Sequence, residues 1–170
     1  MGGTEKQAVW LANKLSSRGY RVFFVSLKDS GILSESLSSN IVVKNFKLAK
    51  AKNIYSKSFY FMLGLIRLIK LVNRNKISKT ITFLFHSNFI GKIVKTFSIH
   101  RNIHVASFRS DRLSKRDSRI SRLRTFIFQY FILDKNTIIV FNSISGFNKL
   151  NLKNIRQEII FNSPLNKNQT

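Results

Sequence analysis

The chain has no cysteine, a single proline and only seven acidic residues. Without cysteine it has no disulfides, no thiol catalysis and no thiolate metal site. The three histidines, His86, His100 and His104, are too scattered for a zinc motif, so we expect neither a metal nor another cofactor. The scarcity of proline, together with abundant Lys, Asn, Ile and Phe, is the composition expected of an AT-rich genome.

The few acidic residues stand against 30 Lys and Arg, which gives the 170-residue chain a net charge of +23. Such a charge attracts polyanions, either nucleic acid or an anionic membrane surface. The alternative is compositional drift, because the positive charges are spread along the chain and are not gathered in one tail. The length and the 44% hydrophobic content predict one domain with a core.

Neither a signal peptide nor a membrane-spanning helix is predicted. Met1 is followed by glycines and not by a basic segment and an apolar one. The most apolar run, residues 59–72, is too short to span a bilayer and contains Arg67 and Lys70. We therefore expect a cytoplasmic protein that is peripheral at the inner face of the cell membrane.

Two glycines, Gly2 and Gly3, precede a segment whose apolar residues have helical spacing. Gly19 is placed to end this helix, and residues 21–27 are predicted to form a buried strand. A Gly-Gly turn at a helix N-terminus offers backbone N–H groups and the positive end of the helix dipole to a phosphate. The alternative is that two glycines beside Met1 have no function.

Helices and strands alternate through the rest of the chain. Strands are predicted at 41–43, 80–85, 103–107, 137–141 and 158–161, and helices at 32–37, 55–76, 90–97, 118–132 and around Phe147. This alternation predicts a Rossmann-like α/β fold, a parallel sheet with helices on both faces. The apolar stripe of the 55–76 helix is expected to pack on the sheet; the alternative is a membrane surface, with a basic side at Arg67, Lys70, Arg74 and Lys76.

In such a sheet, ligands bind beyond the carboxyl ends of the strands. Six polar residues directly follow predicted strands: His86, Asn88, Arg109, Asp111, Asn142 and Ser143. Each of them taken alone is most simply a turn residue. Their shared edge of the sheet makes the set a candidate site.

Seven segments, in order, resemble glycosyltransferase family 4. The first three match a Gly-Gly-x-Glu turn, its helix and an Arg-Gly-His-like stop, and the last resembles an Ile-Pro-Asn-Gly-Ile-Asp segment that leaves the first domain. The segments are Gly2–Gln7, Leu11–Leu15, Arg18–Tyr20, Phe83–Asn88, Ser107–Asp111, Ile138–Ser143 and Ile159–Asn166.

The resemblance implies half of a GT-B enzyme, whose active site lies between two Rossmann-like domains. Residues 1–162 would be the acceptor-side N-terminal domain, and residues 163–170 would begin the interdomain linker. The enzyme would be a retaining hexosyltransferase-type glycosyltransferase. It would move a sugar from a nucleotide sugar to a lipid-linked or cell-envelope glycan acceptor, without a metal.

The resemblance also assigns roles to individual residues. Gly2 and Gly3 match the turn that closes on the donor diphosphate, and His86 matches a catalytic position that faces the sugar. Asn88, Arg109 and Asp111 are placed toward the acceptor. Glu5 lies in the first helical turn, where a carboxylate complements the helix dipole, so we interpret it as structural.

Two departures from the family are expected to matter. The family's first strand, central in the sheet, would precede Gly2, and its absence would leave a gap between neighbouring strands. The C-terminal donor domain, with its two spaced glutamates, has no counterpart after Asn162. We therefore expect that this chain alone is inactive.

Two other classes remain open. One is a basic protein that binds nucleic acid or a membrane surface; it rests on the charge and on aromatic residues between Phe126 and Phe131. Those aromatics have helical spacing with Leu123 and Ile127, which favours core packing. The other is a decayed gene fragment without activity.

Overall fold

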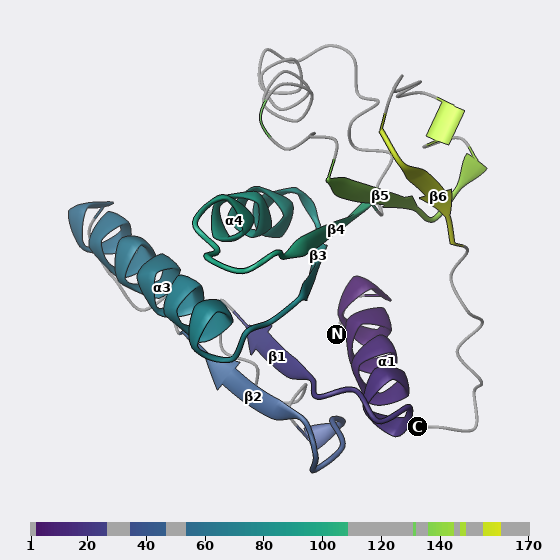
Figure 1. Cartoon of the computed structure of the whole chain (residues 1–170), viewed down its shortest axis with the longest axis horizontal. Coiled ribbons are helices and arrows are strands. Elements are labelled where there is room, and N and C mark those ends of the chain that lie inside the picture. Colours follow the sequence, from purple (N-terminus) through teal and green to yellow (C-terminus); the bar gives the residue numbers. More distant parts are fainter. Residues whose placement is uncertain are drawn as a thin grey trace. The chain divides into compact units, whose positions relative to one another are not determined.

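The computed structural model describes residues 3–26, 35–46, 54–108, 131, 136–144, 147–148 and 155–160. It divides into two compact units, Met1–Lys70 and Leu71–Thr170, each of which is described by itself. The elements in chain order are α1 (Gly3–Ser17), β1 (Phe23–Ser26), β2 (Val42–Asn45), α3 (Ile54–Arg74), β3 (Lys79–Phe83), α4 (Phe85–Thr96), β4 (Ile103–Phe108), β5 (Thr137–Phe141) and β6 (Gln157–Ile159) (Figure 1).

In the first unit, α1 leads into a parallel pair of strands, β1 and β2. Gly19 has a φ of 81°, and the N–H of Tyr20 donates to the carbonyl of Leu15, so the predicted glycine stop is confirmed. The side chain of Asn13 fixes the segment before β2. Its amide donates to the carbonyl of Ser36 at 2.8 Å, and its oxygen accepts from the N–H of Ser38 at 2.9 Å.

The second unit contains a four-stranded parallel sheet in the order β3-β4-β5-β6. Its core lies on the two central strands, where Ala106 and Ile139 are fully buried and Phe108 and Phe141 nearly so. Alternate residues of β5 are buried, and the others are half-buried. This pattern is typical of a parallel strand covered on both faces, and the predicted α/β class with parallel strands is confirmed.

The described strands form two separate sheets. β1 has β2 as its neighbour and β3 has β4, and no strand pairing joins the two sheets within the described residues.

Several predicted elements match the structure closely. The strand predicted at 137–141 has the same bounds as β5, and β4 is one residue longer than the strand predicted at 103–107. The helix predicted at 55–76 is α3, which begins at Ile54 and ends at Arg74. The first half of the helix predicted at 32–37 and nearly all of the one predicted at 118–132 lie outside the described residues.

The end of β3 corrects one prediction. The strand expected at 80–85 ends at Phe83, and α4 begins at Phe85. The N–H of Asn88 donates to the carbonyl of Leu84 at 2.9 Å, which is already a helical bond. His86 and Asn88, expected in a loop, therefore lie in the first turn of α4.

The C-terminal end of α3 is held by its own cap and by one asparagine. Lys76 has a φ of 49°, and the N–H of Ile77 donates to the carbonyl of Val72, as in a glycine-type helix stop. Asn73 joins this end to the segment after α4: its amide donates to the carbonyl of Phe97, and its oxygen accepts from the N–H of Ile99 at 2.9 Å.

We predict that Lys76→Gly stabilises the protein. A lysine has a steric cost in the left-handed region that glycine does not, so the free energy of unfolding should rise by about 0.5–1 kcal/mol. Denaturant titration measures the change. Lys70→Gly, in the interior of α3, is the matched control and should lower the free energy of unfolding by about 1 kcal/mol. A loss of stability in Lys76→Gly would contradict the prediction.

Candidate functional site at the carboxyl edge of the larger sheet

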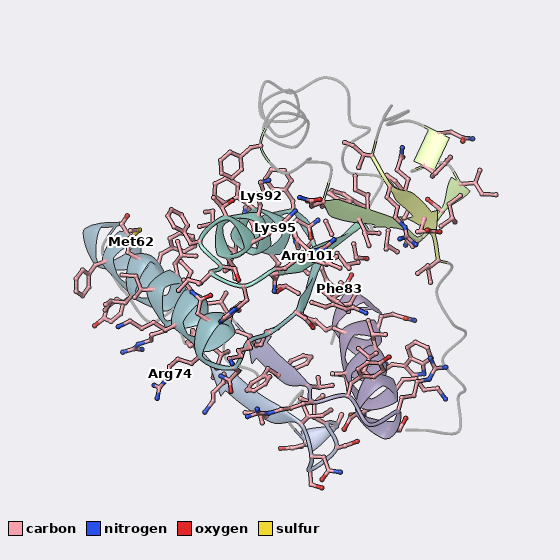
Figure 2. All side chains as sticks on the ribbon, in the orientation of Figure 1. Met62, Arg74, Phe83, Lys92, Lys95 and Arg101 are labelled. Atoms are coloured by element: carbon pink, nitrogen blue, oxygen red, sulfur yellow. The ribbon has the colours of Figure 1, made fainter. Side chains whose placement is uncertain are left out.

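The carboxyl ends of β3, β4, β5 and β6 lie along one edge of the larger sheet. The register pairs Phe83 with Ser107, Phe108 with Phe141, and Phe141 with Ile159, so all four strands end together. Figure 2 labels Phe83, the last residue of β3. Parallel strands leave their following loops and helix N-termini at this edge, which is where the sequence predicts a site.

His86 lies in the first turn of α4 and is exposed. Its ring stands edge-on to that of Phe85, with 5.9 Å between the ring centroids. Phe85 in turn packs against the core cluster of β4 and β5, which fixes the start of the helix. An exposed imidazole on a fixed helix turn can donate or accept a hydrogen bond.

The turn from β3 into α4 has an unusual backbone. Leu84, the residue before the helix, has φ 73° and ψ 156°, a region that is populated almost only by glycine. Its side chain gives no cap to the helix, and the described side chains around it give none either. The first N–H groups of any helix have no intrahelical acceptor, and those of α4 have no side-chain cap either. They face the same edge of the sheet as His86, an arrangement that favours an anion.

Asn88 is on the opposite side of this turn from solvent. It is fully buried, and its oxygen accepts a hydrogen bond from the Thr82 hydroxyl at 2.7 Å. Its amide donates to the carbonyl of Ser107 at 3.3 Å. Asn88 therefore links α4 to strands β3 and β4 on the buried side of the helix. Its expected contact with a sugar acceptor stays a prediction.

The hydrogen bonds around Thr82 fix the protonation of His104. The hydroxyl of Thr82 donates its one hydrogen to Asn88, so it must accept from Nε2 of His104, which lies 2.7 Å away. The fully buried imidazole of His104 therefore carries a proton on Nε2. Thr82, Asn88 and His104 form one polar network where α4 meets the sheet.

Gly91 allows α4 to lie directly on this network. A Cβ placed on Gly91 would meet Nε2 of His104 and would come within 2.7 Å of the Thr82 methyl group. The glycine is buried, and α4 contacts both β3 and β4. The close approach of helix and sheet sets the position of the helix start, and with it that of His86.

The other predicted site residues fall in three places. Gly3 is the exposed first residue of α1 in the first unit, and Gly2, Arg109 and Asp111 lie outside the described residues. Asn142 and Ser143 follow β5 and are half-buried at the same edge as His86. The larger sheet thus brings His86, Asn142 and Ser143 to one edge, as predicted.

The described part of the chain contains neither a metal-binding cluster nor a membrane span. No group of three or more His, Asp or Glu side chains within the described ranges is placed to hold a metal ion. Among the helices of those ranges, none has the length and apolar content needed to cross a membrane.

Sequence reasoning missed Leu84, Gly91 and the network of Thr82 with His104. Gly91 did carry a signal, because an isolated glycine inside a helical apolar pattern often marks a close packing contact. Thr82 and His104 carried a weaker one, since each is a polar residue at a core position of a predicted strand. Nothing in the residue type of Leu84 indicates its backbone conformation.

We predict that the usual order of alanine and glycine is inverted at position 84. Leu84→Gly relieves the backbone strain, whereas Leu84→Ala keeps it, so the glycine variant should be the more stable of the two by about 1 kcal/mol. Denaturant unfolding measures the difference. At Lys92, inside α4, the same pair of variants should show alanine more stable by about 1 kcal/mol. Alanine being the better residue at both positions would refute the strain at Leu84.

We predict that Gly91→Ala destabilises the protein by about 1–3 kcal/mol, because the new methyl group forces α4 away from His104 and Thr82. Thermal unfolding checks the loss. Gly3→Ala is the control, since a Cβ there meets nothing within 4 Å. Equal free energies of unfolding for the two alanine variants would refute the close contact of Gly91 with His104 and Thr82.

No protein-family model matches this chain, and no curated protein has a significantly similar sequence.

Proposed function

We propose that the chain is the acceptor-binding domain of a glycosyltransferase that resembles family 4. The observation that carries the proposal is the exposed His86, held in the first turn of a helix at the carboxyl edge of a parallel sheet. A histidine at that place is next to backbone N–H groups that favour phosphate. Sugar transfer from a nucleotide needs both elements, a diphosphate site and a group that contacts the reacting sugar.

The order of the sequence segments supports the same proposal. The resembling segments are spread over nearly the whole chain, and two of them lie at the carboxyl ends of strands of the larger sheet. Phe83–Asn88 spans the turn from β3 into α4, and Ile138–Ser143 spans the end of β5. Several weak motifs in one order are less expected by chance than a single short motif.

Each residue then has a role in the proposed reaction. His86 contacts the sugar or the acceptor hydroxyl, and Gly2 and Gly3 approach the donor diphosphate with their backbone N–H groups. Arg109 and Asp111 bind acceptor hydroxyls or phosphate. Asn88 acts by holding the first turn of α4 to β3 and β4, so it positions His86.

The proposed substrates are a nucleotide sugar and a lipid-linked or cell-envelope glycan. A second domain would grip the nucleotide, as in other two-domain enzymes of this class, and the chain alone would not turn over substrate. The net charge of +23 would hold the protein at the inner face of an anionic membrane, where such acceptors are found.

A nucleic-acid-binding function is the second candidate, and the same net charge favours it. It predicts a strong dependence of affinity on salt and on the length of the nucleic acid. It assigns no role to His86 at the sheet edge, which is why we rank it second.

We predict that the chain binds a polyprenyl-diphosphate-linked sugar in detergent and that His86→Ala weakens this binding about tenfold, the cost of a hydrogen bond to a charged group. Isothermal titration calorimetry reports binding. His100→Ala is the matched control, because His100 is exposed before β4, at the opposite end of the sheet from His86.

Three results would each refute a part of this proposal. Equal binding by the His86→Ala variant would remove His86 from the site. Turnover of a nucleotide sugar by the chain alone would refute the need for a donor domain. Tight, salt-dependent binding of nucleic acid without any binding of the lipid-linked sugar would favour the second candidate.

The DNA on both sides of the reading frame gives an independent test. A strand-coding segment upstream and a donor domain with paired glutamates downstream would support the transferase. Unrelated intact genes on both sides would overturn it.

A further inference from the structure

All the charged side chains of helix α3 are basic. Its 21 residues, Ile54–Arg74, contain no acidic side chain, and Arg67, Lys70 and Arg74 are exposed in its C-terminal half. A helix that packs on a core usually carries its polar residues opposite an apolar stripe. In α3 the exposed side also carries large apolar residues.

Among residues 58–74 of α3, whose burial the structure describes, four large apolar side chains are open to solvent. Phe59 is 62% exposed, Met62 54%, Tyr60 50% and Ile66 44%. Phe59, Met62 and Ile66 are spaced by three and four residues, so they form one row along the helix. Lys70 and Arg74 continue the same row at steps of four. Figure 2 labels Met62 in the N-terminal half of α3 and Arg74 at its C-terminal end.

The row is therefore apolar in its N-terminal half and cationic in its C-terminal half. The cationic end is fixed: Val72 is only 3% exposed, and Asn73 bonds to the segment after α4. We call the five residues Phe59, Met62, Ile66, Lys70 and Arg74 the α3 row.

We propose that the α3 row is a docking surface for an anionic lipid bilayer. The three apolar side chains enter the boundary between headgroups and acyl chains, and Lys70 and Arg74 contact lipid phosphates. The inference rests on the proposed function in one respect: a lipid-linked acceptor lies in such a bilayer. The inference names α3 as the element that holds the protein at that bilayer.

Charge complementarity favours a bilayer over the other occupants. A second copy of this chain carries the same net charge of +23 and would bring cations against cations. A nucleic acid would pair with Lys70 and Arg74, and bases stack on aromatic rings, but Met62 and Ile66 offer no such platform. An anionic bilayer can contact both the apolar half and the cationic half of the α3 row.

The test is sedimentation with vesicles of phosphatidylcholine, with and without phosphatidylglycerol. A variant with Phe59→Ser, Met62→Ser and Ile66→Ser should lose at least about tenfold in vesicle affinity, because burial of these side chains is lost. Its matched control has Ile99→Ser, Ile144→Ser and Ile160→Ser, three exposed apolar residues elsewhere in the described chain, and should bind like the unmodified protein.

The charges are tested separately. Lys70→Gln with Arg74→Gln should lose about tenfold or more on vesicles that contain phosphatidylglycerol and should differ little on neutral ones. Lys14→Gln with Arg101→Gln, both exposed, removes the same charge elsewhere and should lose clearly less. Circular dichroism checks that every variant is folded.

Each other outcome overturns the inference. Serine variants of the α3 row that bind vesicles as well as their control would exclude it. So would a concentration-dependent dimer that the serine variant abolishes without any vesicle binding, since the row would then be an interface between copies. The vesicles hold no donor and no acceptor. Failure here, with acceptor binding that still depends on His86, would leave the proposed function intact.

Discussion

The contact between α4 and the sheet at Gly91 is the constraint on which the candidate site depends. The glycine lets the helix lie against the buried ring of His104, and Thr82 and Asn88 satisfy the polar atoms that this closeness brings together. A buried polar network of this kind has only one good geometry, because each donor must meet its acceptor. The helix is therefore held at one height and one rotation above β3 and β4.

The turn at the edge of the sheet is a consequence of that fixed position. The chain must pass from Phe83 to the first helical turn within one residue, and Leu84 takes the positive-φ backbone that the short passage requires. The strain at Leu84 and the exposure of His86 thus have one origin. The network buries Asn88 on the inner side of the turn and leaves His86, two residues earlier, on the outer side.

The sequence predicted most of the fold because apolar spacing and glycine stops report directly on burial and on helix ends. The strand at 137–141 and the stop at Gly19 are of this kind. The end of β3 was misplaced because Leu84 and Phe85 continue the apolar run, and no residue type marks the turn. The burial of Asn88 was not predicted, for another reason. The residue type of a polar residue after a strand does not indicate whether it faces the core or solvent in the following helix turn. That depends on Thr82 and Ser107, which lie on two different strands.

The excess of positive charge has a consequence for handling the protein. With a net charge of +23, the chains repel one another in dilute buffer. The exposed Ile81 of β3 and the other exposed apolar side chains would promote association once that repulsion is lost. High salt screens the repulsion, so concentrated samples would aggregate more readily at high ionic strength than at low.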